Sequence, residues 1–451
     1  MRRLLKGAAL ACGLAATGGW AQPTGFWQVS QPDVVELPRV TFNGTGYLDV
    51  KLRFDQLISH QTAPVPDRDN FLDAGTGWLT LRQVVVGDQT YWNVVVRPTE
   101  LLSLGGVSQS APGRVKVVGD SLSDGGTFGY KFTVQGTPLV PAQIWTDWVA
   151  AGLAAPGLCP RYKAVAEQEV ALNPDPAAHT CTSLAVGGGR IHPLGVLGQS
   201  FRTQPFSITR QLQDMARLYP YEPQDVLLLS AGGNDLADLL TLFLDDSTEG
   251  VLKYVLYLNE LVSTSQVWSA STGGRQARIE AGHALMQALA NRLADHLLTE
   301  AWGKGAQRVV LLNMPNVART PRFGAMLNLR TDAAELTQTS GAWATTFNTQ
   351  LANRLADRHS GLITMDFRQL LDDWVTDPAR FGLLNGTDPA CPATGVDSAG
   401  LPDFDLEQCT TANATHAGNT HVFADAFHGT PPMQRQLAKA VLQAMAQRGW
   451  R

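Results

Sequence analysis

The feature that most constrains the fold is a recurring pattern after residue 112, in which a short apolar run ends in a loop of glycine and polar residues. The runs at 115–118, 184–186 and 225–230 are each followed at once by such a loop. Helical stripes of apolar residues separate them from further strands expected at 308–312 and 362–367. Strands that alternate with helices favour a mostly parallel sheet with helices on both faces.

Gly119-Asp120-Ser121-Leu122 forms the first of these loops, directly after the apolar run Val115–Val118. A serine placed where a buried strand turns sharply is held exposed, with its own backbone N–H pointing outward. That arrangement suits a nucleophile, because the hydroxyl reaches a substrate while the amide stabilises an oxyanion. The alternative is an ordinary turn, in which glycine, aspartate and serine are common.

A histidine near the C-terminus has an aspartate three positions before it, in Phe423-Ala424-Asp425-Ala426-Phe427-His428. On one turn of chain both side chains face the same way, so the carboxylate of Asp425 can hold one imidazole nitrogen of His428. The other nitrogen is then free to take a proton from Ser121. Histidine side chains titrate near pH 6.5, which suits proton exchange at neutral pH. The alternative is a surface pair that caps the helix expected at 432–447.

Two further loops carry candidate hydrogen-bond donors for an oxyanion. Leu184–Val186 ends in three glycines at 187–189, which let a backbone amide approach a substrate without obstruction. The strand expected at 225–230 ends in Ala231-Gly232-Gly233-Asn234-Asp235. The side chain of Asn234 is a neutral N–H donor at the carboxyl end of a strand, where α/β sheets place their sites. Taken alone, each feature is also compatible with a plain strand-to-helix loop.

Together, these motifs resemble those of the GDSL, or SGNH-hydrolase, family of lipolytic serine esterases, in particular its secreted bacterial lecithinase- and hemolysin-like branch. The resemblance covers residues 112–451 and includes the sequence motifs at Asn313–Pro321 and Asn385–Cys391. It implies an α/β fold class, the SGNH-hydrolase three-layer sandwich with a mostly parallel sheet, preceded here by a small all-β repeat module. It also implies roles for five residues: the nucleophile Ser121, the backbone donor Gly188, the side-chain donor Asn234, and the acid–base pair Asp425 and His428.

The chain departs from the family pattern at two positions. Ser183 stands where the glycine block often begins with asparagine, and Gly429 follows His428 where the family usually has proline. The first change weakens a supporting hydrogen bond, and the second loosens the loop that holds the base. Neither removes a reacting group, so both are interpreted as adjustments of an active site.

The resemblance implies a secreted carboxylic ester hydrolase that forms an acyl-enzyme on Ser121 and needs no cofactor. Medium-chain or lipid-like esters are the expected substrates, with acetylated polysaccharides and aliphatic polyesters as rivals. A different class is a non-catalytic envelope-binding protein in which the esterase part has decayed. The complete set of motif residues argues against decay.

The segment Leu236–Ser269 is rich in leucine and aromatic residues and directly follows Asn234. It is expected to be helical and is long for a connection. One interpretation is that residues such as Leu240 and Phe243 wall a pocket for the acyl chain. The other is a packed pair of surface helices.

The first residues and the cysteines indicate an oxidising compartment. Residues 1–21 have the charged start, apolar stretch and small-residue end of a signal peptide, and the apolar part is shorter than the roughly 20 residues that span a bilayer. No later transmembrane segment is expected, and the predicted location is secreted or periplasmic. Four cysteines remain after cleavage, and three connectivities can be drawn. The local one is favoured because each pair lies in one loop-rich stretch: Cys159 with Cys181, and Cys391 with Cys409.

Charge and missing motifs exclude several classes of partner. The net charge is −5, which disfavours nucleic acid and anionic membrane surfaces. The chain has no P-loop and no H-E-x-x-H motif, and no metal site is predicted. The acidic run Asp403–Glu407 is interpreted as a solvated loop rather than a calcium site. The expected partner is a small-molecule or lipid ester.

Residues 22–110 differ from the catalytic domain expected at 111–451, because they contain an internal repeat. Copies at 37–59 and 81–103 are 44 positions apart and share seven identical pairs: Leu37/Leu81, Val40/Val84, Tyr47/Tyr91, Val50/Val94, Arg53/Arg97, Leu57/Leu101 and Ser59/Ser103. Each copy has two β-rich runs around a polar turn, Asn43-Gly44 or Gly87-Asp88, which predicts two hairpins that pair into one small sheet. The module is either a structural cover for the catalytic domain or a contact with an envelope, polymer or partner.

Overall fold

The computed structural model describes residues 33–42, 45–62, 70–86, 89–107, 113–136, 142–153, 155–166, 169–193, 204–328, 330–397 and 400–450. For residues 83, 85, 86, 89, 90 and 417 it describes the backbone alone. The signal peptide predicted at 1–21 and the hairpin turns predicted at Asn43-Gly44 and Gly87-Asp88 lie outside these ranges. No helix in the described part of the chain is both long and apolar enough to cross a membrane.

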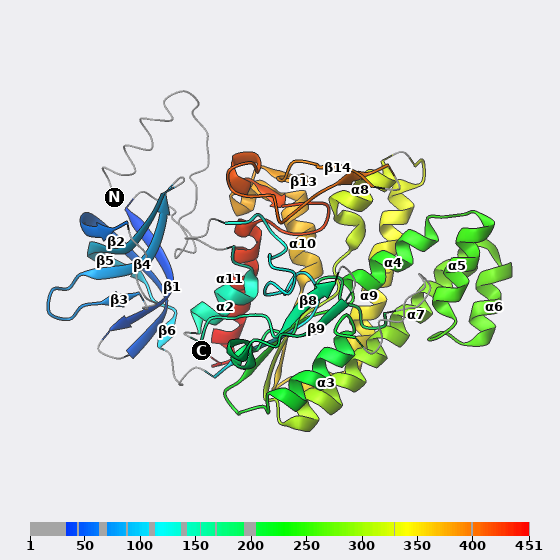
Figure 1. Cartoon of the computed structure of the whole chain (residues 1–451), viewed down its shortest axis with the longest axis horizontal. Coiled ribbons are helices and arrows are strands. Elements are labelled where there is room, and N and C mark those ends of the chain that lie inside the picture. Colours follow the sequence, from blue (N-terminus) through cyan, green and yellow to red (C-terminus); the bar gives the residue numbers. More distant parts are fainter. Residues whose placement is uncertain are drawn as a thin grey trace.

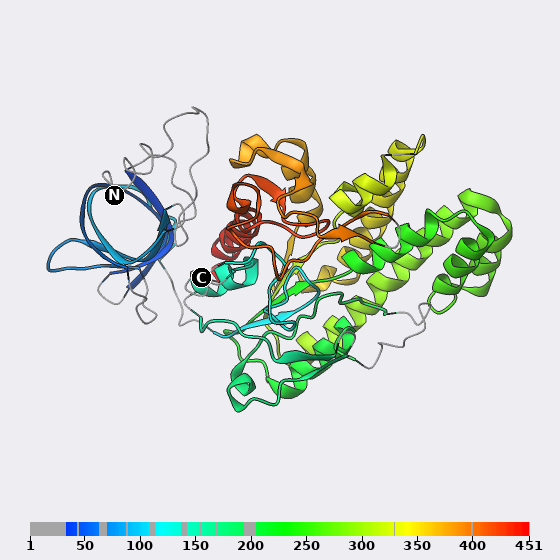
Figure 2. The same ribbon diagram turned by 45° about the horizontal axis from the view of Figure 1, so that its top comes forward.

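The N-terminal strands form a closed barrel, seen end-on in blue in Figure 2. Its strands are β1 (Val34–Phe42), β2 (Thr45–Gln61), β3 (Phe71–Leu72), β4 (Leu79–Val86) and β5 (Gln89–Ser103), and the short β6 (Gly106–Val107) pairs with the start of β2. Neighbours run in the order β1, β3, β4, β5, β2, and β2 pairs again with β1 to close the ring. The β1–β3 pairing is parallel and the other pairings are antiparallel.

The sequence repeat corresponds to the two long hairpins of this barrel. The first copy spans β1 and β2, and the second spans β4 and β5. Three of the identical pairs are buried in the barrel interior: Leu37/Leu81, Val40/Val84 and Val50/Val94. The hairpins therefore do not simply lie side by side in one small open sheet. They close into a ring through the short strand β3 and the long pairing of β2 with β5.

A second sheet lies in the larger body and is entirely parallel. Its order is β12 (Leu362–Met365), β11 (Arg308–Leu312), β10 (Val226–Ser230) and β7 (Val115–Val118). These strands match the apolar runs expected from the sequence. β7 and β10 are parallel neighbours, and both are buried along their whole length. Their carboxyl ends therefore bring the loops that follow them to the same edge of the sheet.

Helices pack against this sheet in two apolar clusters (Figure 1). One cluster joins the sheet to α3 (Ile208–Leu218), α4 (Gly233–Phe243), α5 (Thr248–Leu258), α6 (Thr264–Thr272), α7 (Gly274–His296), α8 (Pro321–Leu327) and α9 (Ala333–Arg354). The other joins it to α2 (Trp145–Gly152), α10 (Phe367–Thr376) and α11 (Pro431–Gln447). Shorter helical turns are η1 (Pro176–Thr180), the π-helical η3 (Leu297–Ala301), η4 (Trp302–Lys304), η5 (Val317–Arg319), η6 (Ala356–Arg358), η7 (Pro378–Phe381) and η8 (Thr415–Gly418).

Three two-stranded ribbons and two disulfides complete the larger body. The ribbons pair β8 (Tyr162–Ala166) with β9 (Glu169–Leu172), β13 (Asn385–Pro389) with β16 (His421–Phe423), and β14 (Gly395–Val396) with β15 (Pro402–Asp403). The disulfides join Cys159 to Cys181 and Cys391 to Cys409. This is the local connectivity that the sequence favoured.

The fold class expected for the chain, an SGNH-hydrolase three-layer sandwich with a mostly parallel sheet behind a small all-β module, is wrong. The largest sheet is the closed five-stranded mixed barrel, and antiparallel strand pairings outnumber parallel ones in the described residues. The parallel sheet has four strands. The expectation failed because strand–helix alternation is a local signal, whereas barrel closure depends on pairings between distant strands.

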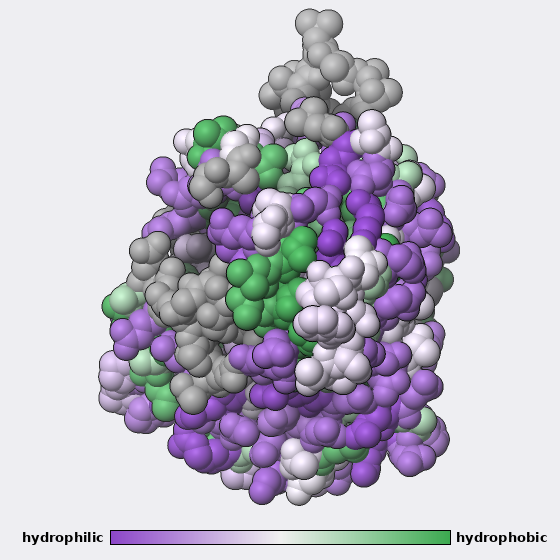
Figure 3. Space-filling view, turned by 90° about the vertical axis from the view of Figure 1, so that its right-hand side faces the viewer, coloured by the Kyte–Doolittle hydropathy of each residue, from purple (hydrophilic) through white to green (hydrophobic). Residues whose placement is uncertain are grey.

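The segment Leu236–Ser269 folds into α4, α5 and part of α6. Some of its apolar side chains are buried in the core, and others are exposed to solvent. Leu240 and Phe243 are 0% and 3% exposed and belong to the core. Leu252, Leu256 and Trp268 are instead exposed to solvent. Figure 3 views this end of the molecule and shows apolar surface surrounded by polar residues. The packed pair of surface helices is therefore the better of the two interpretations.

Candidate active site

Ser121 lies in a tight turn that directly follows β7. The carboxylate of Asp120 accepts hydrogen bonds from the amide of Leu122, at 3.1 Å, and from the hydroxyl of Ser230, at 2.8 Å. A side chain at Gly119 would come within 2.5 Å of the Ser230 hydroxyl, so glycine lets the end of β7 approach the end of β10. The turn thus follows from two strand ends packing closely, and it leaves Ser121 8% exposed.

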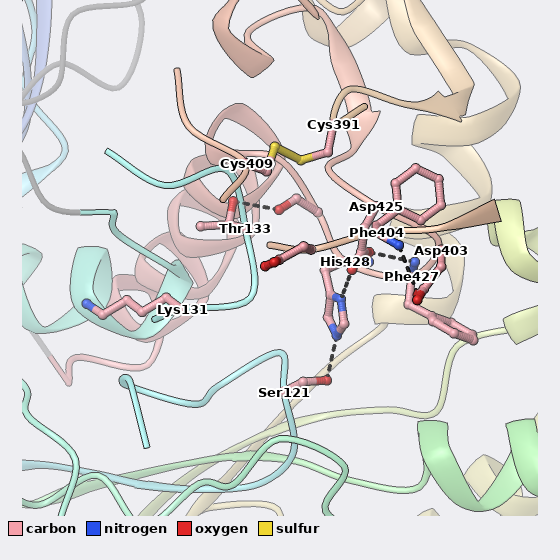
Figure 4. A network of polar contacts seen from close by, with 12 residues as sticks. Ser121, Lys131, Thr133, Cys391, Asp403, Phe404, Cys409, Asp425, Phe427 and His428 are labelled. Carbon is pink, nitrogen blue, oxygen red and sulfur yellow. Dashed lines mark hydrogen bonds and ion pairs between the residues drawn. A yellow bond between two sulfur atoms is a disulfide. The ribbon is translucent and has the colours of Figure 1, made fainter. Parts of the chain in front are cut away.

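His428 and Asp425 lie in the loop between β16 and α11, and this loop brings them to Ser121 (Figure 4). Nε2 of His428 is 2.8 Å from Oγ of Ser121, and Nδ1 is 2.7 Å from Oδ2 of Asp425. Serine and histidine are 307 positions apart in sequence. The three side chains form one continuous hydrogen-bonded line, as a base-activated serine requires.

Asp425 is held in place by more than the imidazole. Its Oδ1 accepts hydrogen bonds from the amides of Phe427, at 2.8 Å, and His428, at 2.6 Å. Burial alone would raise the pKa of the Asp425 carboxyl, but the nearby His428 and these hydrogen bonds bring the pKa below its ordinary value. The carboxylate is therefore ionised at neutral pH and can stabilise an imidazolium.

The three glycines after Val186 form a turn beside the loop of Ser121. The amide of Gly189 donates to the carbonyl of Val186, at 2.9 Å, and Gly188 has a φ of +75°. A positive φ at the third residue of such a turn is typical of glycine. Gly188 lines the same cavity as Ser121. No hydrogen bond within the described part of the chain uses the Gly188 amide, so this N–H is available to a bound group.

Asn234 stands in the first turn of α4, at the carboxyl end of β10. Gly232 precedes the helix with a φ of +94°, which turns the chain sharply out of the strand. One hydrogen of the Asn234 amide is donated to the carbonyl of Gly189, at 3.0 Å. The side chain thereby ties α4 to the glycine turn. Asn234 also lines the cavity that contains Ser121.

A cavity of about 260 Å³ is lined by Ser121, Gly188, Asn234 and His428. The polar side chains among its lining residues are Asp120, Ser121, Asn234, Thr320 and His428, and Gly188 and Gly233 line it with backbone. Apolar side chains make most of the remaining wall: Leu122, Phe132, Ala237, Pro315, Val317, Phe367, Leu371, Phe427 and Met433. The arrangement suits a ligand that has one polar reacting group and an apolar extension.

The expectation that the segment after Asn234 forms the wall of the cavity is largely wrong. Within 236–269, Ala237 reaches the cavity, whereas Leu240 and Phe243 point into the core. The wall comes instead from α10 and α11, through residues such as Leu371 and Met433. These helices begin far from Asn234 in the sequence, so adjacency along the chain was a poor guide.

Gly429, one of the two departures from the family pattern, is held by hydrogen bonds. Its carbonyl accepts from the hydroxyl of the fully buried Thr133, at 2.8 Å, and its backbone pairs with that of Phe423. A side chain at 429 would meet Met433 at 2.3 Å, so the small residue leaves room for Met433 beside the cavity. The loop is thus supported without proline.

Ser183, the other departure, pairs through its backbone with Val117 of β7 and does not line the cavity. Its hydroxyl is buried, and among the described residues it has no hydrogen-bond partner. The acidic run Asp403–Glu407 shows no metal cage: in the described chain, no three acidic, histidine or cysteine side chains are placed to hold a metal ion.

Two residues near the site had not been singled out from the sequence. Phe132 lines the cavity, and its ring centroid lies 4.9 Å from that of His428. Asp124 is fully buried and accepts a hydrogen bond from Gly187, at 2.7 Å. The only sequence signal for Asp124 is its place three residues after Ser121. No feature of the sequence pointed to Phe132.

No model of a known protein family matches the chain, and no curated protein matches it significantly either. The interpretation of the site therefore rests on the geometry described above and on the motifs that the sequence carries.

Proposed function

We propose that the protein is a GDSL-type serine esterase, which hydrolyses carboxylic esters through an acyl-enzyme on Ser121. The observation that carries the proposal is the line from Ser121 through His428 to Asp425, with contacts of 2.8 and 2.7 Å, at the polar end of an apolar cavity. A buried serine turn without a base would not support this chemistry. The contact to His428 supplies that base.

In the proposed reaction, Oγ of Ser121 attacks the ester carbonyl while Nε2 of His428 takes the serine proton. Asp425 holds Nδ1 of His428 and stabilises the imidazolium. The tetrahedral intermediate collapses as the imidazolium gives its proton to the leaving alcohol. Water then attacks the acyl-enzyme with His428 as base, and the acid is released.

The negative charge on the former carbonyl oxygen needs donors that are in place beforehand. The amides of Ser121 and Gly188 and the side chain of Asn234 are proposed for this role. Two of them belong to a turn and a helix that a 3.0 Å hydrogen bond joins, from Asn234 to the carbonyl of Gly189. Such prior order is the main source of oxyanion stabilisation.

The apolar wall supports a substrate with a medium acyl chain or a lipid-like group. Each methylene buried there contributes about 0.8 kcal/mol until the cavity is full. Leu371 and Met433 take the place that Leu240 and Phe243 had in the sequence-based hypothesis. Secretion to the periplasm or the exterior is part of the proposal, supported by the two disulfides.

The test is a ladder of p-nitrophenyl esters from acetate to laurate, assayed with the purified full chain and with Ser121→Ala. The wild type should prefer medium chains to acetate, and Ser121→Ala should be inactive on every ester. A fluorophosphonate should label Ser121. The matched control is Ser271→Ala, because the Ser271 hydroxyl binds a helix carbonyl and the residue does not line the cavity.

Each part of the proposal has its own contrary result. Full activity of Ser121→Ala, or labelling elsewhere with Ser121 untouched, would refute the serine mechanism. Acetylated sugars as the best substrates, with no gain from acetate to hexanoate, would point to a polysaccharide deacetylase. Asn234→Ala should reduce turnover by about 10²–10³-fold, as loss of one oxyanion donor does.

A further inference from the structure

Asp124 is a buried carboxylate that the proposed reaction does not use. It is 0% exposed, and Oδ1 accepts hydrogen bonds from the amides of Gly126, at 2.9 Å, and Thr127, at 2.7 Å. These two bonds close an ordinary turn next to the nucleophile. Oδ2 points elsewhere and accepts from the amide of Gly187, at 2.7 Å. One carboxylate therefore joins the Ser121 loop to the glycine turn.

Arg190 holds the same glycine turn from its other side. Its Nη1 donates to the carbonyl of Gly188, at 2.6 Å. Its Nε and Nη2 bind both oxygens of Asp238, at 2.5 and 2.9 Å. Asp238 lies one helical turn after Asn234 on α4. The guanidinium thus connects the glycine turn to the helix that carries Asn234.

These contacts surround one peptide bond. The peptide between Gly187 and Gly188 carries the Gly188 N–H, and it is flanked by the Gly187 amide on one side and the Gly188 carbonyl on the other. Glycine has more backbone freedom than any other residue, so three glycines in a row do not hold a peptide plane by themselves. Asp124 fixes the first flank and Arg190 fixes the second.

Neither side chain lines the cavity, so neither is placed to touch a bound molecule. Their effect on a reaction would pass through the glycine backbone. Arg190 suits its partner, because a cation donates to a carbonyl and charge-assisted hydrogen bonds are the stronger kind. The carboxyl of Asp124 accepts from the Gly187 amide, which is the role of a carboxyl oxygen. The sequence could not indicate the contact of Asp124, since Asp124 lies 63 positions before Gly187 in a different loop, whereas Arg190 lies two positions after Gly188.

We propose that Asp124 and Arg190 are positioning residues that aim the Gly188 amide at the oxyanion. The inference rests on the proposed esterase function and deepens it. It assigns the alignment of one oxyanion donor to two named side chains. Removing either contact should raise the barrier of the chemical step and leave the binding of the substrate unchanged.

Asp124→Asn is the sharpest variant because it keeps the shape of the side chain. Its remaining oxygen can still accept from Gly126 and Thr127, but its new amide group faces the N–H of Gly187 and cannot accept from it. We expect kcat for a p-nitrophenyl ester to fall by about 10–100-fold, a part of the loss seen when an oxyanion donor is removed. KM should stay within twofold.

Asp73→Asn is the matched control. The carboxylate of Asp73 accepts from the amides of Gly75 and Thr76, at 3.0 and 2.8 Å, which is the same turn with the same residue types. Asp73 lies in the barrel and has no contact with the glycine turn. This variant should keep kcat and KM of the wild type.

Arg190→Gln tests the other flank and stays informative if Asp124→Asn does not fold. The Arg190 side chain is 28% exposed, so its replacement is easier to accommodate. We expect the same pattern: kcat lowered about tenfold or more, with KM within twofold. Arg217→Gln is its control, because Arg217 makes an ion pair with Asp214 and does not line the cavity.

The binding of an alkyl boronic acid separates alignment from general structural damage. The boronate ester on Ser121 is tetrahedral and needs the oxyanion donors, so its affinity should fall in proportion to kcat/KM in both variants. Folding is checked by the melting temperature, and rates are taken per folded molecule.

The outcomes also separate this inference from the proposed function. An active Ser121→Ala protein would refute the esterase mechanism itself. With Ser121→Ala inactive, a folded Asp124→Asn or Arg190→Gln protein with kcat within twofold of wild type would overturn the positioning role. A raised KM at unchanged kcat, or equal losses in the two controls, would overturn it as well.

Discussion

At Asp425, burial and the contact with His428 act against each other, and the contact prevails. Burial favours the neutral carboxyl, whereas His428 and two backbone amides favour the carboxylate, so the pKa lies below its ordinary value. A carboxyl whose pKa is lowered on folding stabilises the folded state above its unfolded pKa of about 3.9. That stabilisation is lost as the pH falls through the lower, folded-state pKa.

The lowered pKa of Asp425 leads to a prediction for Asp425→Asn. Its melting temperature should be below that of the wild type at pH 7, and the difference should shrink as the pH is lowered below about 4. Turnover at pH 7 should fall by about 10⁴-fold, as in other serine triads in which asparagine replaces the aspartate. Melting curves from pH 2.5 to 7 and ester assays measure both effects. A stability difference that grows toward low pH would contradict the assignment.

The loop that carries His428 is braced by the disulfide between Cys391 and Cys409. The amide of Cys391 donates to the carbonyl of Ala424, at 2.8 Å, and the amide of Ala424 donates to the carbonyl of His428, at 2.7 Å. On the other side, the carbonyl of Cys409 accepts from the amide of Gln135, at 2.7 Å. The disulfide therefore joins the loop that carries His428 to the segment that contains Gln135. Figure 4 shows the disulfide together with Asp425 and His428.

The other disulfide is separated from the site by a strand-like run. Cys181 precedes the glycine turn, but the amides of Leu184 and Val186 donate to the carbonyls of Val117 and Gly119, at 2.8 and 3.1 Å. These bonds anchor the run to β7 independently of the disulfide. The two disulfides thus close loops of similar length, with sequence separations of 18 and 22, but differ in their connection to the base.

We therefore expect different activities when each disulfide in turn is replaced by two serines. Replacing either cysteine pair should lower the free energy of unfolding by about 3 kcal/mol, the chain-entropy value for loops of this size. Only Cys391→Ser/Cys409→Ser should also lower kcat of the folded protein. Denaturant titration and ester assays at a temperature well below both melting points measure this. Equal kcat values for the two variants would contradict the bracing role.

The barrel and the body that carries the site have separate cores. The buried cluster of the barrel contains residues between Val35 and Val96 only, and every residue that lines the cavity follows position 112. An ion pair joins the two parts, between Glu36 of β1 and Lys439 of α11 at 3.4 Å, with both side chains partly exposed. Such a pair contributes at most about 1 kcal/mol.

A truncated chain that begins at Ser110 should therefore hydrolyse a small soluble ester at nearly the rate of the full chain. Its melting transition should be the one assigned to the larger body in the full protein. Calorimetry and kcat/KM for p-nitrophenyl acetate measure both. If the truncated chain is soluble and folded but inactive, the barrel must shape the site.

What the sequence determined by itself is what depends on neighbours along the chain. The strands at 115–118, 308–312 and within 225–230 and 362–367 were predicted because runs of β-branched and leucine residues between turn signals leave few alternatives. Helices α7 and α9 match the apolar stripes expected before the strands at 308–312 and 362–367, and α11 matches the helix expected at 432–447. The two local disulfides followed from cysteine spacing. The strand-end rule also indicated that the loops with Ser121 and Asn234 would meet.

Tertiary structure alone decided which distant groups touch. The barrel closes because β3 and the β2–β5 pairing complete a ring, and no property of one hairpin contains that information. Leu240 is buried in the core rather than the cavity because the face that α4 turns to the sheet is set by packing. Asp124 reaches Gly187 across 63 positions of chain, through one hydrogen bond. Contacts of this kind depend on how whole elements pack, and local residue patterns carry no record of that packing.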